Sequence, residues 1–113
     1  MDNIEVEKSK AHVTVEITEY MSRSVVSKTI IKKLTGNISV MSFDRGQGLS
    51  EKISPFDTYL QIIDGNAEIV IDSKSHLLET GESIIIPAHT CSLIKPKTRF
   101  KMISTVIKSG YEE

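Results

Sequence analysis

The residues with the most evident chemical potential are three histidines and a single cysteine. His89 and Cys91 stand two positions apart and form the one His/Cys pair that is close in sequence. Zinc normally takes three or four protein ligands, so this pair does not by itself predict a metal site. His12 and His76 lie far from it in the chain, and we expect both to be exposed. No serine stands in a nucleophile-elbow motif, so a serine hydrolase is not predicted.

The composition is typical of one globular domain that spans residues 1–113. Apolar residues make up 39% and charged residues 26% of the chain, unlike a disordered sequence. The formal net charge is −1 and the basic residues are scattered, which argues against a nucleic-acid partner. Residues 1–10 carry several charges and no apolar run, so they form no signal peptide and are the candidates for disorder.

The cysteine content and hydropathy indicate where the protein works. A single cysteine, Cys91, excludes an intramolecular disulfide and is typical of a reducing compartment. No stretch is long and apolar enough to cross a bilayer. We therefore expect a cytoplasmic protein without a membrane partner.

Hydrophobic residues recur with a period of two, which predicts short β-strands along most of the chain. Val13, Val15 and Ile17 alternate with polar residues and predict a first strand. Alternation and β-branched residues predict further strands at residues 25–31, 38–43, 58–63, 67–71, 83–86, 93–94 and 100–107. A helical turn could lie within residues 19–26.

Turn-forming residues separate these segments at 35–37, 44–48 and 72–75. Asp64 and Gly65 predict a two-residue hairpin, because both tolerate a positive φ. Short strands with turns roughly every 8–12 residues are typical of an antiparallel sandwich or barrel. Basic residues near the C-terminus alternate with other residues, which predicts the solvent face of a strand; they are Lys95, Lys97, Arg99 and Lys101.

From Gly46 onward the chain resembles the cupin family in two spaced motifs. The family's first motif is a glycine, five residues, His-x-His, three or four residues, a glutamate, six residues and a glycine; here it spans residues 46–65, ending at Gly65. The second motif is a glycine, five residues, Pro-x-Gly, two residues, a histidine, three residues and an asparagine. It spans residues 81–96, where Gly81 and Pro87 fit it.

This resemblance implies an all-β fold, a single cupin (RmlC-like) antiparallel β-barrel of the jelly-roll type. The chain is similar to small single-domain bacterial cupins, which commonly pair through their sheets, so we expect a homodimer. The strand predicted at Val13–Ile17 would then add to the partner's sheet and cover an exposed edge.

The resemblance fails at the four positions where cupins hold their metal. Those positions carry Lys52, Ser54, Thr58 and Ser92, while His89 and Pro96 replace the glycine and asparagine of the second motif. Cupin metals are held by imidazole nitrogens and a carboxylate oxygen. An ammonium group has no lone pair to donate, and a neutral hydroxyl is a weak ligand. We therefore expect no metal and no other cofactor, and the family's oxygenase and isomerase activities are not carried over.

Lys52 is the strongest candidate for binding a ligand. If its side chain faces the barrel interior, its charge needs a partner, because burying an unpaired charge is costly. That partner could be Asp57, Glu51, or the carboxylate or phosphate of a ligand. The alternative is a lysine on the loop before the strand, with its amine in water. A desolvated lysine could also act as a nucleophile in Schiff-base chemistry.

The remaining candidates are polar residues near the mouth of the predicted barrel. Ser54, Thr58 and Ser92 could hold a polar ligand or an ordered water, or they could satisfy one another and the backbone. His89, in the turn after Pro87, and Asp57 lie close to the same motif positions.

These observations favour a metal-free cupin that binds or senses a small polar or anionic molecule in its barrel. The alternative from another class is a metal-independent isomerase or lyase, which needs an acid–base residue facing the cavity. A third interpretation is a filled barrel whose role is interaction alone. An open cavity, a convergent acid–base pair or a filled interior distinguishes the three.

Overall fold

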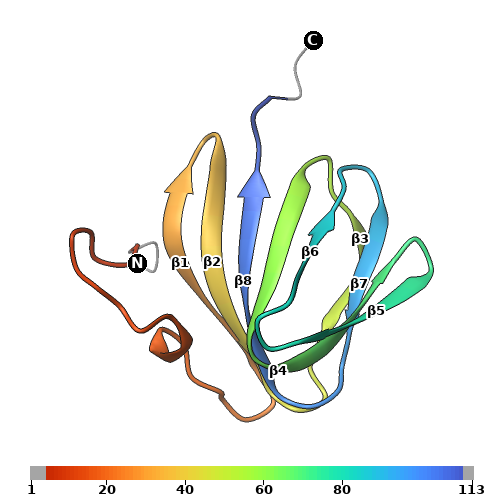
Figure 1. Cartoon of the computed structure of the whole chain (residues 1–113), viewed down its shortest axis with the longest axis horizontal. Coiled ribbons are helices and arrows are strands. Elements are labelled where there is room, and N and C mark those ends of the chain that lie inside the picture. The colour runs from red at the N-terminus through yellow and green to blue at the C-terminus, as the bar shows by residue number, and fades with distance from the viewer. Residues whose placement is uncertain (1–4, 111–113) are drawn as a thin grey trace.

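Eight antiparallel strands curl into a barrel in the computed structural model, which describes residues 5–110 (Figure 1). The strands are β1 (Val25–Lys33), β2 (Gly36–Phe43), β3 (Leu49–Ile53), β4 (Asp57–Ile71), β5 (Lys74–Glu79), β6 (Ser83–Ile86), β7 (Cys91–Lys95) and β8 (Phe100–Ile107). The predicted all-β barrel is confirmed. The predicted strands at 25–31, 38–43, 83–86, 93–94 and 100–107 all lie within observed strands, whereas β3 and β5 were not predicted.

The long strand β4 belongs to both halves of the barrel. Its first part pairs with β6 and β8, and its second part pairs with β5 and β7. The hairpin predicted at Asp64 and Gly65 is wrong, because both residues lie inside β4 and pair with Lys101 and Phe100. A positive φ of 77° at Gly65 accompanies a register shift just before Asp64, so this sequence signal marks a β-bulge and not a turn.

A two-residue hairpin does join β4 to β5 at Asp72 and Ser73. Their φ values of 47° and 71° are those of a type I′ turn, which matches the twist of the strands it joins. This turn falls within the turn predicted at residues 72–75.

The hydrophobic core includes the last residue of β2 and the first residue of β8, and these strand ends meet at the lower end of the barrel in Figure 1. The rings of Phe43 and Phe100 are stacked there, with centroids 4.4 Å apart and no exposed surface. Ile62 and Ile69 from the two parts of β4 are equally buried. Burying each such side chain contributes about 1.5–3 kcal/mol to the stability of the barrel.

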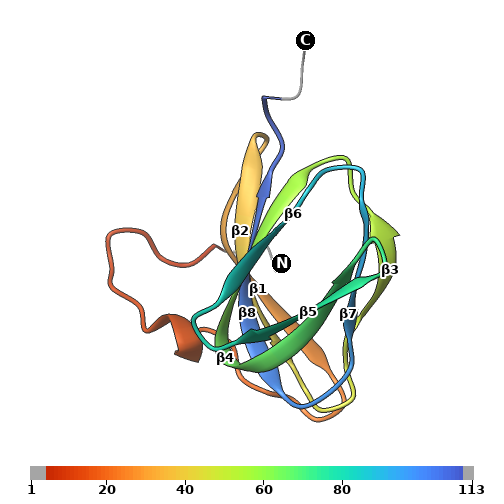
Figure 2. The same ribbon diagram turned by 45° about the vertical axis from the view of Figure 1, so that its right-hand side comes forward.

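The N-terminal segment does not form the strand predicted at Val13–Ile17. Residues Thr14–Glu16 form a short 3₁₀ helix, η1, and the chain around it runs beside the barrel (Figures 1 and 2). The helical turn suggested for residues 19–26 is also absent, since Arg23 has a φ of 58° and β1 starts at Val25. The segment lacks a neighbouring strand among residues 5–110, so its alternating pattern has no ladder to join.

Lys101 explains how this segment is held, and it corrects the prediction that Lys101 faces solvent. Its side chain leaves β8 on the side opposite the core and is only 8% exposed. The ammonium donates to the carbonyls of Val15 and Thr18 at 2.6 Å and lies 5.0 Å from the centre of the Tyr20 ring. Tyr20 in turn donates its hydroxyl to Asp64 at 2.7 Å.

Further polar contacts extend this anchorage. The hydroxyls of Thr18 and Ser42 form a buried hydrogen bond with each other. The main-chain N–H of Arg23 and the guanidinium of Arg99 both donate to Asp44, and they lower the pKa of that carboxyl to about 2. Lys95 and Lys97 are exposed, as predicted, and both pair with Glu68 on the outer surface.

The segment predicted to be disordered, residues 1–10, is only partly covered. Residues 1–4 lie outside the described part of the chain. Glu5 accepts a hydrogen bond from the main-chain N–H of Lys32 on the edge strand β1 at 2.6 Å. Within residues 5–110, no helix is long and apolar enough to cross a membrane.

We expect Lys101→Met to loosen the N-terminal segment. Loss of two charge-assisted hydrogen bonds lowers the free energy of unfolding by about 2 kcal/mol. Hydrogen exchange of residues 14–20 will also become faster than in the wild type. Lys95→Met is the control, because Lys95 is exposed and its substitution changes stability by about 0.5 kcal/mol or less. Unchanged exchange in the Lys101 variant would show that the anchor lies elsewhere.

We expect Gly65→Ala to destabilise the barrel more than Gly81→Ala does. Both glycines have a positive φ, but an added Cβ at Gly65 meets Arg99 O below normal contact distance, whereas at Gly81 it meets nothing within 4 Å. Strain alone costs about 1 kcal/mol at Gly81, and strain plus the clash costs about 3 kcal/mol at Gly65. Urea unfolding measures both losses, and equal losses would contradict the bulge's role.

Candidate functional site

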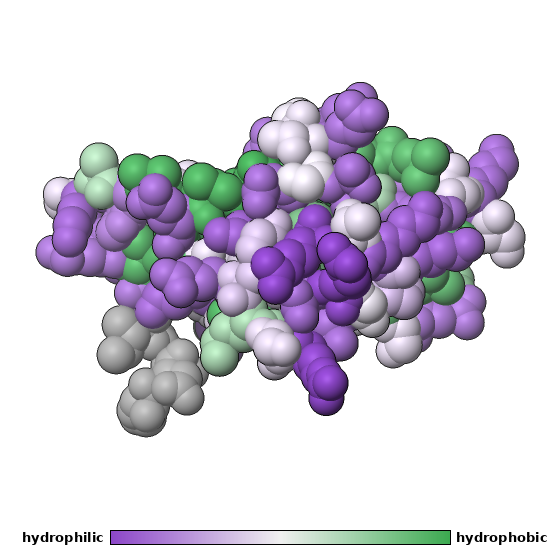
Figure 3. Space-filling view, turned by 90° about the horizontal axis from the view of Figure 1, so that it is seen from below, coloured by the Kyte–Doolittle hydropathy of each residue, from purple (hydrophilic) through white to green (hydrophobic). Residues whose placement is uncertain are grey.

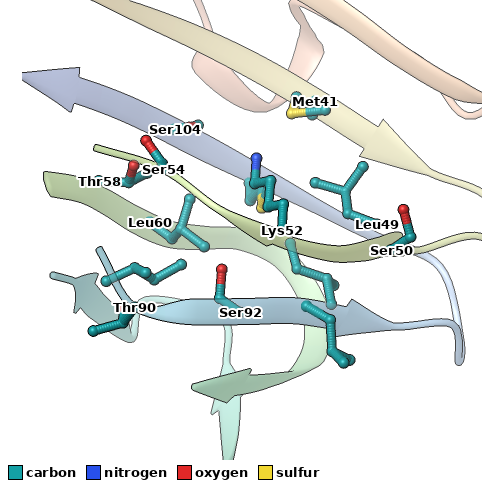
Figure 4. A pocket seen from close by; sticks show the side chains of 14 residues that line it. Met41, Leu49, Ser50, Lys52, Ser54, Thr58, Leu60, Thr90, Ser92 and Ser104 are labelled. Atoms are coloured by element: carbon teal, nitrogen blue, oxygen red, sulfur yellow. The ribbon is translucent and has the colours of Figure 1, made fainter. Parts of the chain in front are cut away.

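A cavity of about 200 Å³ lies inside the barrel, and part of its wall is formed by residues of the hydrophobic core. Figure 4 shows its walls, to which β3 and β7 contribute together with β4 and β8. The lining is part apolar and part polar. Its apolar members are Met41, Leu49, Leu60, Ile86, Leu93, Ile94 and Met102, and its polar members are Ser50, Lys52, Ser54, Thr58, Thr90, Ser92 and Ser104. Among these described residues, Lys52 is the only one with a charged side chain.

A β-bulge in β3 directs Lys52 into this cavity. Strict alternation from Leu49 would place Glu51 on the inner face and Lys52 on the outer one. A register shift between Leu49 and Lys52 reverses the direction of the residues that follow it. As a result, Leu49 and Lys52 both line the cavity, and Glu51 does not. Lys52 pairs with Ser92 across the ladder, so it lies within a strand and not on the loop considered above. Its amine points into the cavity in Figure 4.

Lys52 also keeps contact with solvent, because it is an exposed residue that lines the cavity. Neither carboxylate considered as its partner neutralises it. Glu51 accepts a hydrogen bond from the thiol of Cys91, and Asp57 accepts one from the N–H of Ala88. Within residues 5–110, Lys52 forms no ion pair. Its ammonium therefore faces the cavity without a protein counter-ion from this part of the chain.

The three hydroxyl residues at the other motif positions line the same cavity. Ser92 is buried in β7 between Lys52 of β3 and Ile71 of β4, and its hydroxyl points inward (Figure 4). Thr58 lies near the start of β4, and Ser54 follows the last residue of β3. The Ser54 hydroxyl accepts a hydrogen bond from the N–H of Phe56 at 3.2 Å, so part of its capacity serves the backbone.

Asp57 and His89, the other two predicted residues, are not among the residues that line the cavity. Asp57 caps the turn that contains Ala88. His89 is exposed, and its main-chain N–H donates to Ser54 O at 2.6 Å. Its φ of 66° is left-handed, which suits the glycine that the second motif has at this position. Both residues support the rim of the barrel from outside the cavity.

Cys91 faces outward and does not join His89 in a cluster. It borders an outer hollow together with Glu51 and Asp72. The thiol of Cys91 donates a hydrogen bond to Glu51. This hydrogen bond is the main cause that raises the pKa of Cys91 above its ordinary value, and burial is the second. A thiol held in the protonated form is a poor nucleophile and a poor metal ligand. No group of three or more histidine, cysteine or carboxylate side chains in residues 5–110 is arranged to hold a metal.

The histidines expected to be exposed differ from each other. His12 is exposed, and its ring lies 2.9 Å from the carbonyl of Glu7. His76 is half-buried in β5, where it pairs with Ile69.

Several residues of the cavity were not singled out in the sequence. Met102 belongs to the buried core and Met41 packs against it, and both form part of the cavity wall. Ser104 and Thr90 contribute hydroxyls from β8 and from the turn before β7. Ser104 lies two residues from Met102 and four from Phe100, so the period of two along β8 was the signal that could have found it.

Other proteins of known structure share this fold. No protein-family model and no curated protein matches the sequence. A conserved protein of unknown function from Streptococcus pyogenes matches with a TM-score of 0.88 and 26% identity, over 95% of this chain and 94% of that one. A cupin superfamily protein from Desulfitobacterium hafniense matches with a TM-score of 0.86 and 25% identity, over 94% and 97%.

A third match is a cupin 2 conserved barrel domain protein from Leptotrichia buccalis, with a TM-score of 0.80 and 28% identity. The match covers 83% of this chain and 46% of that larger one. This chain has the fold of a small cupin domain. The four positions at which cupins hold their metal converge on one cavity here, but an ammonium and three hydroxyls are an unsuitable donor set for a divalent ion. The donors present do not fit the usual cupin metal.

Proposed function

We propose that this cupin binds a small anionic molecule in its barrel and does so without a metal. The observation that supports the proposal is Lys52, a cation directed into the cavity by a bulge, with no ion pair within residues 5–110. An anionic ligand would supply the missing counter-charge through a charge-assisted hydrogen bond. The hydroxyls of Ser54, Thr58 and Ser92 offer further donors and acceptors to the oxygens of the ligand.

The alternatives receive less support. A cavity of about 200 Å³ favours binding over a filled barrel that acts by interaction alone. An isomerase or lyase needs an acid–base group beside its substrate, and both predicted candidates, Asp57 and His89, lie outside the described lining. Schiff-base chemistry at Lys52 is disfavoured because the residue is exposed and lacks the desolvation that activates a lysine.

The proposed setting is a cytoplasmic homodimer. A lone cysteine whose thiol stays protonated suits a reducing compartment. Ile85 of β6 and Tyr59 of β4 pair side by side on the outer face and are 62% and 39% exposed. A second copy that packs on this apolar pair would cover it.

Lys52→Met tests the anion-binding proposal, since it keeps the length of the side chain and removes the charge. We expect its affinity for acetate, hexanoate, succinate or phosphate, whichever the wild type binds, to fall about 10- to 100-fold. Isothermal titration calorimetry measures the change. Lys74→Met is the matched control, because Lys74 is an exposed lysine away from the cavity. Equal affinities for wild type and Lys52→Met would contradict the proposal, as would failure of every anion to bind.

Ile85→Glu tests the dimer. We expect sedimentation equilibrium to give the dimer mass for the wild type and the monomer mass for this variant, because a buried carboxylate in an apolar interface is unfavourable. Leu34→Glu, at the 97%-exposed tip of the β1–β2 hairpin, is the control and will remain a dimer. A monomeric wild type would overturn the proposed assembly.

A further inference from the structure

The interior of the barrel changes from polar to apolar along its axis. On β8, which points upward in Figure 1, Ser104 lines the upper part of the cavity, and Met102 lies below it. On the opposite wall, the β3 segment places Ser54 and Lys52 in the upper part of the cavity and Leu49 below them. In Figure 4, Ser54 and Ser104 lie at one end, Leu49 and the exposed Ser50 lie at the other, and the Lys52 amine lies between them.

The two strands between these walls repeat the pattern. β4 runs downward through Thr58, Leu60 and Ile62, and β7 runs downward from Ser92 to Ile94. The β3–β7 ladder joins residues of like character, because Lys52 pairs with Ser92 and Leu49 pairs with Ile94. The ladders of β4 are mixed, since they pair Leu60 with Ser104 and Thr58 with Ile86. The ammonium and the hydroxyls of Ser54, Thr58, Ser92 and Ser104 therefore lie in the upper part, which Leu60 and Ile86 share with them. The lower part is aliphatic apart from Ser50 beside Leu49.

The lower part ends on closed structure. The stacked rings of Phe43 and Phe100 lie beneath it and have no exposed surface. The outside of this end, seen from below in Figure 3, presents mainly hydrophilic residues. A ligand group that enters the cavity past Lys52 therefore meets an apolar floor formed by the described residues.

We propose that the ligand is an organic monocarboxylate with a short, flexible apolar tail, and this inference rests on the anion binding proposed above. Its carboxylate lies against Lys52 and the hydroxyls, and its tail extends down toward Met41 and Met102. Methionine side chains are flexible and adapt to irregular apolar groups, so this floor accepts a tail that bends.

Charge and size both favour this class over a phosphate ester or a dicarboxylate. Lys52 neutralises one negative charge, and a second charge would lie unpaired near the aliphatic lower part at a large desolvation cost. The cavity of about 200 Å³ is also smaller than the ~300–1,000 Å³ of pockets that take drug-sized ligands. A head group with a few methylenes matches this space.

A chain-length series tests the inference with the intact protein. Isothermal titration with acetate, butyrate and hexanoate should show affinity that rises about fourfold per added methylene, until the tail fills the cavity. Hexanamide has the same tail without the charge and should bind at least 10-fold more weakly than hexanoate. Succinate and phosphate should bind more weakly than hexanoate as well.

The possible failures separate the two proposals. Equal binding of acetate, phosphate and hexanoate, all lost in Lys52→Met, would overturn the tail assignment and leave anion binding intact. Equal binding of hexanoate and hexanamide would instead overturn anion binding, and with it the inference. Affinity that does not change from acetate to hexanoate would also overturn the inference.

Variants of the floor provide a second readout. Met41→Ala enlarges the lower part and should move the preferred chain from hexanoate toward octanoate. Leu49→Phe fills it and should move the preference toward butyrate. Both sites are only partly buried, so these variants retain the barrel, which circular dichroism will verify. The control is Ile85→Phe on the outer face, for which the preference should not change. An unchanged preference in both cavity variants would contradict a tail directed at this floor.

Discussion

Strand β4 runs through both halves of the barrel, and Gly65 is the residue at which it changes partners. Up to that residue β4 pairs with β6 and β8, and beyond it with β5 and β7. The bulge needs a left-handed backbone next to Arg99, where a side chain has no room. Because the four partner strands take their positions from β4, this local requirement also sets which walls face each other across the cavity.

The cavity keeps the convergence of the cupin motif positions, although the residues at those positions differ from those that hold a metal. Its motif positions still converge, because they depend on strand register and turn glycines and not on the residues that hold a metal. A second bulge, in β3, then presents Lys52 to the interior in place of Glu51. Charge and hydroxyls thus occupy a layer that donor nitrogens occupy in a metal-binding cupin.

Two lysines in this chain illustrate how differently a charge is accommodated. Lys101 is buried on the outside of the barrel, where carbonyls of Val15 and Thr18 and the face of Tyr20 satisfy its ammonium. Its contacts are complete, and it serves to hold the N-terminal segment. Lys52 has solvent on one side and the cavity on the other, with no ion pair in residues 5–110. An incompletely satisfied cation in a cavity suits binding, whereas a fully satisfied one suits structure.

The sequence by itself determined the all-β class, most strand positions and the convergence of Lys52, Ser54, Thr58 and Ser92, because period-two patterns and motif spacing are local properties. It misassigned Asp64 and Gly65, since a positive φ serves a hairpin and a bulge equally well. It also misassigned residues 13–17 and Lys101, because alternation does not reveal whether a partner strand exists or which segment folds over a face. Only the tertiary structure decided the inward direction of Lys52 and the polar-to-apolar order of the cavity, which depend on bulges and on pairing between distant strands.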